Sequence, residues 1–295
     1  MSGMRQGWAS IVAVCVAAGT LPAQEITAAA VLTRSRAALG LEAPASVTSI
    51  RMLGTSTRVL GALRLGGAVD LRLALPDRYL RVDVLALPGA LPGTRGETAT
   101  GFNRDTPIQR AIGPAGQPVD VTTFVSAEAR EQTLRSAADL VRHDLRLLLL
   151  GFFADSFDSS PLTAKHLGIA EAPDGRAYGL ALTFANGSEA ILFVDTTTHL
   201  PRMVTWNGPD VVSAARAAGQ TSGTGQPSMP HADVRAHLDT LVEHRWHFGD
   251  YRPVGRFRWP FVLRHAVAGS LVEELRFDQV MVNPVFEASV FDRER

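Results

Sequence analysis

The sequence predicts a mainly β protein of the α+β class, built on one large antiparallel sheet that wraps around helices. Three observations predict this fold. Segments of alternating apolar and polar residues follow one another across short turns in both halves of the chain. One long amphipathic helix separates the two halves. We find no internal repeat and no linker, so a single continuous sheet explains the pattern with the fewest pieces.

The N-terminus has the pattern of a cleaved secretory signal. Arg5 precedes an apolar run from Trp8 to Ala18, and small residues mark a boundary at Ala23. The run is too short to cross a hydrocarbon core, which needs about 20 apolar residues. We therefore expect residues 1–23 to be a signal peptide and residues 24–295 to form a single exported domain.

Composition excludes several classes of function. Lys+Arg and Asp+Glu are equal at 29 each, so no net positive charge favours nucleic acid or an anionic membrane surface. The single cysteine, Cys15, lies within the apolar run of the signal, so the mature protein would hold no disulfide. Val14 precedes it where a lipobox needs a small residue, which argues against a lipid anchor.

The first half predicts a helix and a series of strands. The helix covers residues 27–39 and stops at Gly40. The hairpin around Pro76 places alternating leucines and valines, Leu73 and Val82 among them, on one buried face, with Arg81 and Asp83 on the other. The expected strands are 48–57, 59–65, 69–75, 80–84, 98–103 and 108–112.

The central helix begins after the cap residue Ser126 and runs to about Phe153. Apolar residues form one stripe along most of its length. In its last two turns, residues 147–150 and 152–153 are apolar nearly all round. We therefore expect this end to be buried on more than one side.

The second half returns to strands. Residues 178–184 and 190–194 flank Asn186-Gly187, a favoured hairpin turn, and 202–206 is the next strand. Residues 207–232 are small and polar and predict a surface excursion or a mobile flap, with a helical turn at 211–218 as an option. A meander follows from 242 to 291, with reversals expected at Gly249-Asp250 and Gly269-Ser270.

The titratable residues do not form a catalytic or metal-binding pattern. His244 and His247 are three apart on a strand, and residues with that spacing point to opposite faces, as do the adjacent Glu273 and Glu274. Asp195 is expected to serve its own turn. Phosphate-loop, EF-hand and zinc motifs are absent from the sequence. We expect no enzyme activity, no metal and no cofactor.

Five short motifs carry a resemblance to a known family. They are F-V-D-T-T-T-H-L-P at 193–201, D-Y-R-P-V at 250–254, W-P at 259–260, E-E-L-R-F at 273–277 and V-N-P-V-F at 282–286. With the order of elements, they resemble the outer-membrane lipoprotein carrier superfamily, the LolA/LolB-like fold of Gram-negative bacteria. One position departs from the carriers: Leu75 stands before Pro76, where they have an arginine that holds the lid closed.

The resemblance implies a half-open β-barrel in the periplasm, with helices covering a concave face that holds acyl chains. It implies a non-enzymatic binding or carrier protein for a lipid or acylated ligand, acting as a monomer and without nucleic acid. The alternative is an envelope sensor or interaction module with an envelope protein partner.

The ligand cavity predicted on this basis is lined by apolar residues of the central helix and the sheet. Ordinary core packing of the same helix end is an equally open interpretation. The predicted lining residues are Leu73, Val82, Leu145, Leu148, Leu149, Phe152, Phe153, Leu182, Phe184, Trp206 and Leu263.

Overall fold

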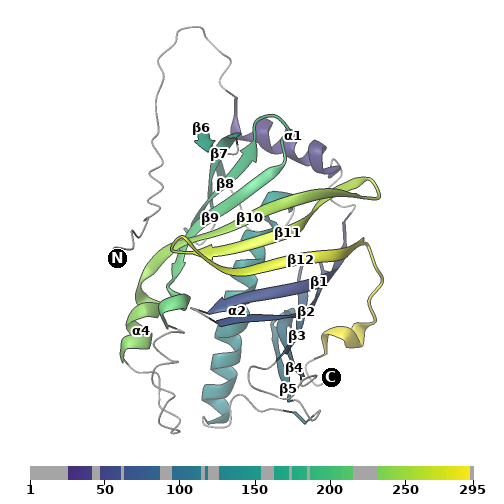
Figure 1. Cartoon of the computed structure of the whole chain (residues 1–295), viewed down its shortest axis with the longest axis vertical. Coiled ribbons are helices and arrows are strands. Elements are labelled where there is room, and N and C mark those ends of the chain that lie inside the picture. Colours follow the sequence, from purple (N-terminus) through teal and green to yellow (C-terminus); the bar gives the residue numbers. More distant parts are fainter. Residues whose placement is uncertain are drawn as a thin grey trace, which may run out of the picture.

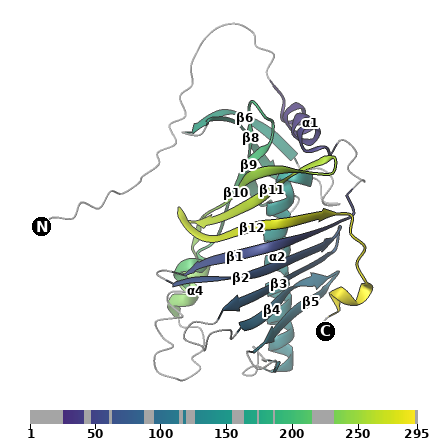
Figure 2. The ribbon, with the colours of Figure 1, turned by 45° about the vertical axis from the view of Figure 1, so that its right-hand side comes forward.

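A computed structural model describes residues 26–41, 47–60, 63–86, 95–113, 117–118, 126–153, 163–172, 175–184, 187–214 and 232–292. In this part of the chain, twelve strands form one open antiparallel sheet in the order β5-β4-β3-β2-β1-β12-β11-β10-β9-β8-β7-β6 (Figures 1 and 2). The predicted fold class, a curved antiparallel sheet with few helices, is confirmed. The predicted signal peptide lies outside the described residues.

The strands of the N-terminal half are β1 (Ser49–Leu60), β2 (Leu63–Ala74), β3 (Arg78–Ala86), β4 (Arg95–Asn103) and β5 (Thr106–Ile112). Those of the C-terminal half are β6 (Thr163–Ala172), β7 (Gly175–Thr183), β8 (Glu189–Asp195), β9 (Pro201–Pro209), β10 (Leu241–Val254), β11 (Phe257–Val267) and β12 (Ser270–Val282). The helices are α1 (Ala28–Leu39), α2 (Ala127–Phe153), α4 (Ala232–Asp239) and the 3₁₀ turn η3 (Ala288–Phe291).

Helix α1 forms where the sequence predicts it. The Thr27 side chain accepts a hydrogen bond from the backbone of Ala30 at 3.2 Å, and Gly40 ends the helix in the left-handed region with φ 75°. A side chain at Gly40 would meet the backbone oxygen of Arg256 at 2.3 Å. Glycine therefore allows both the helix stop and its close packing on the β10–β11 turn.

Helix α2 crosses the concave side of the sheet (Figure 2). Its principal contacts are with β4 and β5 on one flank and with β8 and β9 on the other. Four leucines near its C-terminal end are buried, and at 100° per residue they span about 200° of the helix circumference; they are Leu145, Leu147, Leu148 and Leu149. The predicted burial on more than one side is confirmed, because the curved sheet encloses this end of the helix.

Some element predictions are wrong in detail. The reversal expected at Gly249-Asp250 does not occur, since β10 continues to Val254 and keeps its register with β11 on both sides of Asp250, which has φ 54°. The chain turns at Gly255-Arg256 instead. The reversal next to Gly269 is confirmed. Strand β6 and helix α4 have no counterpart among the predicted elements.

The β2–β3 hairpin does not have the single buried face predicted for it. The register pairs Leu73 with Tyr79 and Asp70 with Val82, which places Leu73 and Val82 on opposite faces. Leu73 faces the main core, whereas Leu80 is buried on the convex side in a small cluster with Ala99, Ile108 and Phe291 that Val82 packs against. Arg81 and Asp83 therefore point to the concave side, where sequence alternation alone had placed the aliphatic residues.

Candidate ligand-binding face

The structure brings most of the predicted lining residues together. Eight of the eleven belong to one hydrophobic cluster between α2 and the concave face of the sheet, here called the inner face. They are Leu73, Leu145, Leu148, Leu149, Leu182, Phe184, Trp206 and Leu263. All eight are between 0% and 8% exposed, so their side chains pack against protein in this closed arrangement.

The other three predicted residues are not in this cluster. Val82 packs against the convex cluster, because its register places it on the other face of β3. Phe152 and Phe153 lie in the last turn of α2, but their side chains are outside the described residues. The assignment of a ligand to these positions stays a prediction.

A row of polar side chains crosses the inner face beside the apolar cluster. Along β1 the inner positions change from Ile50 and Met52 to Ser56 and Arg58. Along β12 they change from Phe277 and Leu275 to Glu273, and β3 adds Arg81 and Asp83. We call Ser56, Arg58, Arg81, Asp83 and Glu273 the polar belt. The inner face is thus apolar towards one end of the sheet and polar towards the other.

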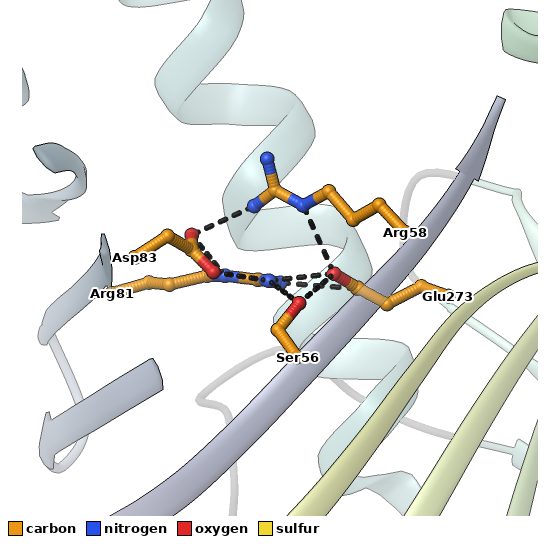
Figure 3. Close-up of polar contacts among 5 residues, drawn as sticks. All are labelled: Ser56, Arg58, Arg81, Asp83 and Glu273. Atoms are coloured by element: carbon orange, nitrogen blue, oxygen red, sulfur yellow. Dashed lines mark hydrogen bonds and ion pairs between the residues drawn. The ribbon is translucent and has the colours of Figure 1, made fainter. Parts of the chain in front are cut away.

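The two arginines of the polar belt bridge its two carboxylates (Figure 3). Arg81 donates to Asp83 at 2.7 and 2.8 Å and to Glu273 at 2.6 and 3.0 Å. Arg58 donates to Asp83 at 2.7 Å and to Glu273 at 3.2 Å. The Ser56 hydroxyl lies 3.2 Å from Glu273 and 3.3 Å from Arg81. Two positive and two negative groups therefore balance within hydrogen-bond distance.

This pairing keeps Glu273 ionised inside the protein. Burial alone would raise the pKa of Glu273, but the charges of Arg81 and Arg58 and their hydrogen bonds outweigh it and lower the pKa to about 2. Buried charge is costly unless it is paired, so each member of the polar belt depends on the others. Replacing a whole buried ion-pair network with apolar residues often costs no stability, so stability alone does not account for such a network.

A stack of indole and imidazole rings continues the row across β9, β10 and β11. His244 Nδ1 and His265 Nε2 are 3.2 Å apart, and His265 stacks on Trp246 and Trp206 with ring centroids 4.6 and 5.7 Å away. Burial lowers the pKa of His265 to about 4, helped by the charge of His244, so this imidazole is neutral at pH 7. Among the described residues, no group of three or more His, Cys, Asp or Glu could hold a metal ion.

Helix α2 presents titratable groups to the same row. Burial, followed by the charge of Glu273, raises the pKa of Asp144 to about 6. Burial also lowers the pKa of His143, to which the charges of Arg146 and His244 contribute. Asp144 nevertheless remains accessible to water.

Solved structures resemble this fold. A DUF1329 family protein from Desulfovibrio piger matches with a TM-score of 0.47 at 12% identity, over 90% of this chain and 97% of its own. A LolA superfamily protein from Nitrosomonas europaea matches with a TM-score of 0.45 at 10% identity, over 90% and 98%. Both TM-scores lie below 0.5 and both identities are 12% or less. No family model and no curated protein matches the chain.

Several other sequence predictions can be compared with the site. His244 is buried whereas His247 is exposed, and Glu273 and Glu274 have separate partners, so the predicted opposite orientations are confirmed. Asp195 accepts hydrogen bonds from the backbone of Thr197 and Thr198, which confirms its turn role. None of the described helices is long and apolar enough to cross a bilayer.

The polar belt was missed by the sequence analysis. The signal that could have found it is the spacing of opposite charges two residues apart at Arg81 and Asp83, which places both on one face of a strand. Ser56 and Arg58 show the same spacing. The sequence could not reveal that this face is the inner one, because that depends on pairing with β12, more than 200 residues later in the chain.

Proposed function

We propose that this protein is a non-enzymatic periplasmic binding or carrier protein that holds a hydrophobic ligand, a lipid or an acyl chain, on its inner face. The observation that carries the proposal is the single apolar cluster that α2 and the sheet share across the inner face. Helices cover this cluster, and a helix can be displaced without breaking the hydrogen bonds of the sheet. We expect the protein to act as a monomer.

Helix α2 would act as the lid of this site. Its principal contacts are with the two flanks of the sheet. A ligand that entered between the leucines of α2 and the sheet would bury its own methylene groups, at about 0.8 kcal/mol per methylene. The closed packing of the eight lining residues then represents the empty state of the protein.

Two measurements test the proposal. Protein purified without detergent is extracted with organic solvent, and the extract is analysed by mass spectrometry for lipid. The stripped protein is then titrated with the apolar fluorophore N-phenyl-1-naphthylamine. We expect co-purified lipid and saturable binding at about one probe per chain. Protein that carries no lipid, binds no probe and co-purifies with one protein partner would instead support an envelope sensor.

A pair of variants connects probe binding to the predicted lining. Leu148 is buried in the shared cluster, whereas Leu238 on α4 is 43% exposed. We expect Leu148→Ser to weaken probe binding by the folded protein at least tenfold and Leu238→Ser to leave it unchanged. Equal affinities in the two variants, measured on samples whose folded fraction is verified by circular dichroism, would remove this end of α2 from the site.

A further inference from the structure

Three polar groups around Glu273 have no partner in the described part of the chain. The first belongs to Arg58, whose Nε and one Nη bind carboxylates while the other Nη points away from both of them (Figure 3). The side chain of Arg58 is 34% exposed, although both of its carboxylate partners are buried. One N–H group of Arg58 therefore points out of the polar belt towards space that solvent can reach.

The second group is the indole N–H of Trp246. It is buried and has no hydrogen-bond acceptor among the described residues. Trp246 stacks on His265, and His265 pairs with Glu273 across β11 and β12. A buried donor without an acceptor destabilises the folded protein, because it has lost its hydrogen bond to water. An acceptor brought by a ligand would remove this cost.

The third group is the carboxylate of Asp144, for which the described residues supply neither a hydrogen bond nor an ion pair. It is an exposed residue of α2, and the charge of Glu273 contributes to its raised pKa after burial. The surroundings of Glu273 therefore offer two donors and one acceptor that no part of the described chain uses.

We propose that these groups bind the polar end of the ligand, and that this end is a neutral ester and hydroxyl headgroup of the acylglycerol class. Its ester carbonyl and hydroxyl oxygens accept from Arg58 and Trp246, and one of its hydroxyls donates to Asp144. Its acyl chain extends along the neighbouring apolar cluster. This inference rests on the proposed function and specifies the ligand of the same site.

Charge balance selects the neutral headgroup. The positive charges of Arg58 and Arg81 are already matched by Asp83 and Glu273, and both imidazoles of the stack have lowered pKa values. A carboxylate or phosphate would be repelled by Asp144, to which the described residues supply no ion pair. In a poorly hydrated interior an unpaired charge is strongly disfavoured, whereas a neutral group loses little if its hydrogen bonds are made.

The experiment compares two ligands that differ only in their polar end. Palmitic acid and 1-monopalmitoylglycerol, below their aggregation limits at pH 7.5, compete with bound N-phenyl-1-naphthylamine for the purified protein. We expect the ester to displace the probe at a concentration at least tenfold lower than the acid. Equal potency, or greater potency of the acid, overturns the inference while probe binding upholds the proposed function. If N-phenyl-1-naphthylamine itself does not bind, both this inference and the proposed function are refuted.

Two variants test whether the preference for the ester over the acid depends on Arg58 and Asp144. Arg58→Lys keeps the charge but removes the outward-pointing Nη, and we expect it to weaken the ester about tenfold and the apolar probe by less than about twofold. Asp144→Asn removes the unpaired charge, and we expect it to strengthen palmitic acid severalfold with little change for the ester. The control is Asp139→Asn, because Asp139 is an exposed acid on the same helix that pairs with Arg142. An unchanged ester-to-acid ratio in both test variants would refute the assignment.

Discussion

Two adjacent residues show how strongly the fold separates similar side chains. Glu273 is buried and bound by Arg81 and Arg58, whereas Glu274 points to the other face and pairs with Arg264 and Arg276 near the surface. Side chains alternate along β12, so the two carboxylates point to opposite faces of the sheet. Because buried charge is costly unless it is paired, only the ion pairs of Glu273 are important for stability.

We expect Glu273→Ala to lower the free energy of unfolding by about 3–5 kcal/mol, because it leaves two guanidinium groups short of a carboxylate in the interior. The neighbouring Glu274→Ala should cost less than about 1 kcal/mol, as is typical of exposed ion pairs. Urea denaturation of both variants measures this contrast. Similar losses in the two would mean that the polar belt is not held together by Glu273.

The same carboxylate gives a pH dependence of defined sign. The pKa of Glu273 is about 2 in the folded protein, below its ordinary value of 4.5. The stabilisation from its ionised form is therefore complete above pH 4.5 and is lost as the pH falls towards 2.

Asp144 should act in the opposite direction. Its pKa is about 6 in the folded protein, above its ordinary value of 3.8, so the folded state favours the protonated carboxyl. Stability from this group is present below pH 3.8 and is lost as the pH rises through 6. We expect Asp144→Asn to raise Tm at pH 7.5 and to leave it unchanged at pH 3.8. A Tm difference that is independent of pH would show that the pKa of Asp144 is not raised by folding.

At the scale of elements, the side chain of Arg142 ties α2 to one flank of the sheet. The guanidinium of Arg142 lies 4.6 Å from the centre of the Phe102 ring on β4, donates to the backbone oxygen of Arg104 and pairs with Asp139. Arg135, two turns earlier on the same side of the helix, pairs only with Glu131 of its own helix among the described residues.

If α2 is the lid, Arg142→Ala should open it more readily. Loss of a cation–π contact weakens the closed state by about 0.5–2 kcal/mol, so we expect the uptake rate of N-phenyl-1-naphthylamine to rise severalfold in stopped-flow fluorescence. Arg135→Ala is the control and should take up the probe at the rate of the unchanged protein. A lower Tm for Arg142→Ala with an unchanged uptake rate would mean that α2 is a fixed part of the core.

At the scale of the whole molecule, the sheet has one seam between distant parts of the chain. Strands β1 and β12 pair from Ile50–Val282 to Arg58–Glu273, with a shift in register at Gly54. A side chain at Gly54 would lie 2.0 Å from the backbone oxygen of Arg276. The two halves of the sheet can therefore approach closely only with glycine at this position.

We expect Gly54→Ala to lower the free energy of unfolding by at least about 1–3 kcal/mol, the usual range for overpacking, because backbone and not a flexible side chain must move. Gly66→Ala on the adjacent strand β2 is the matched control, since nothing lies within 4 Å of its added methyl group. Chemical denaturation of both variants decides the point. Comparable stabilities would mean that the seam tolerates displacement.

The sequence by itself determined what depends on neighbouring residues. Alternation predicted most strands, Gly40 and Gly269 marked their helix stop and turn, and the apolar end of α2 indicated burial on more than one side. It also placed eight of the eleven proposed lining residues in one cluster, because apolar residues are buried wherever the fold puts them.

Only the tertiary structure decided which face of each strand is the inner one. Apolar alternation suggested that Val82 faces inwards and Arg81 outwards, yet pairing with β2 reverses this. Arg81 can be buried because Glu273, almost 200 residues later in the chain, lies within hydrogen-bond distance. A charged side chain is stable in the interior only beside a partner of opposite charge. The pairing of strands determines which residue that partner is, and strand pairing cannot be deduced from a local sequence pattern.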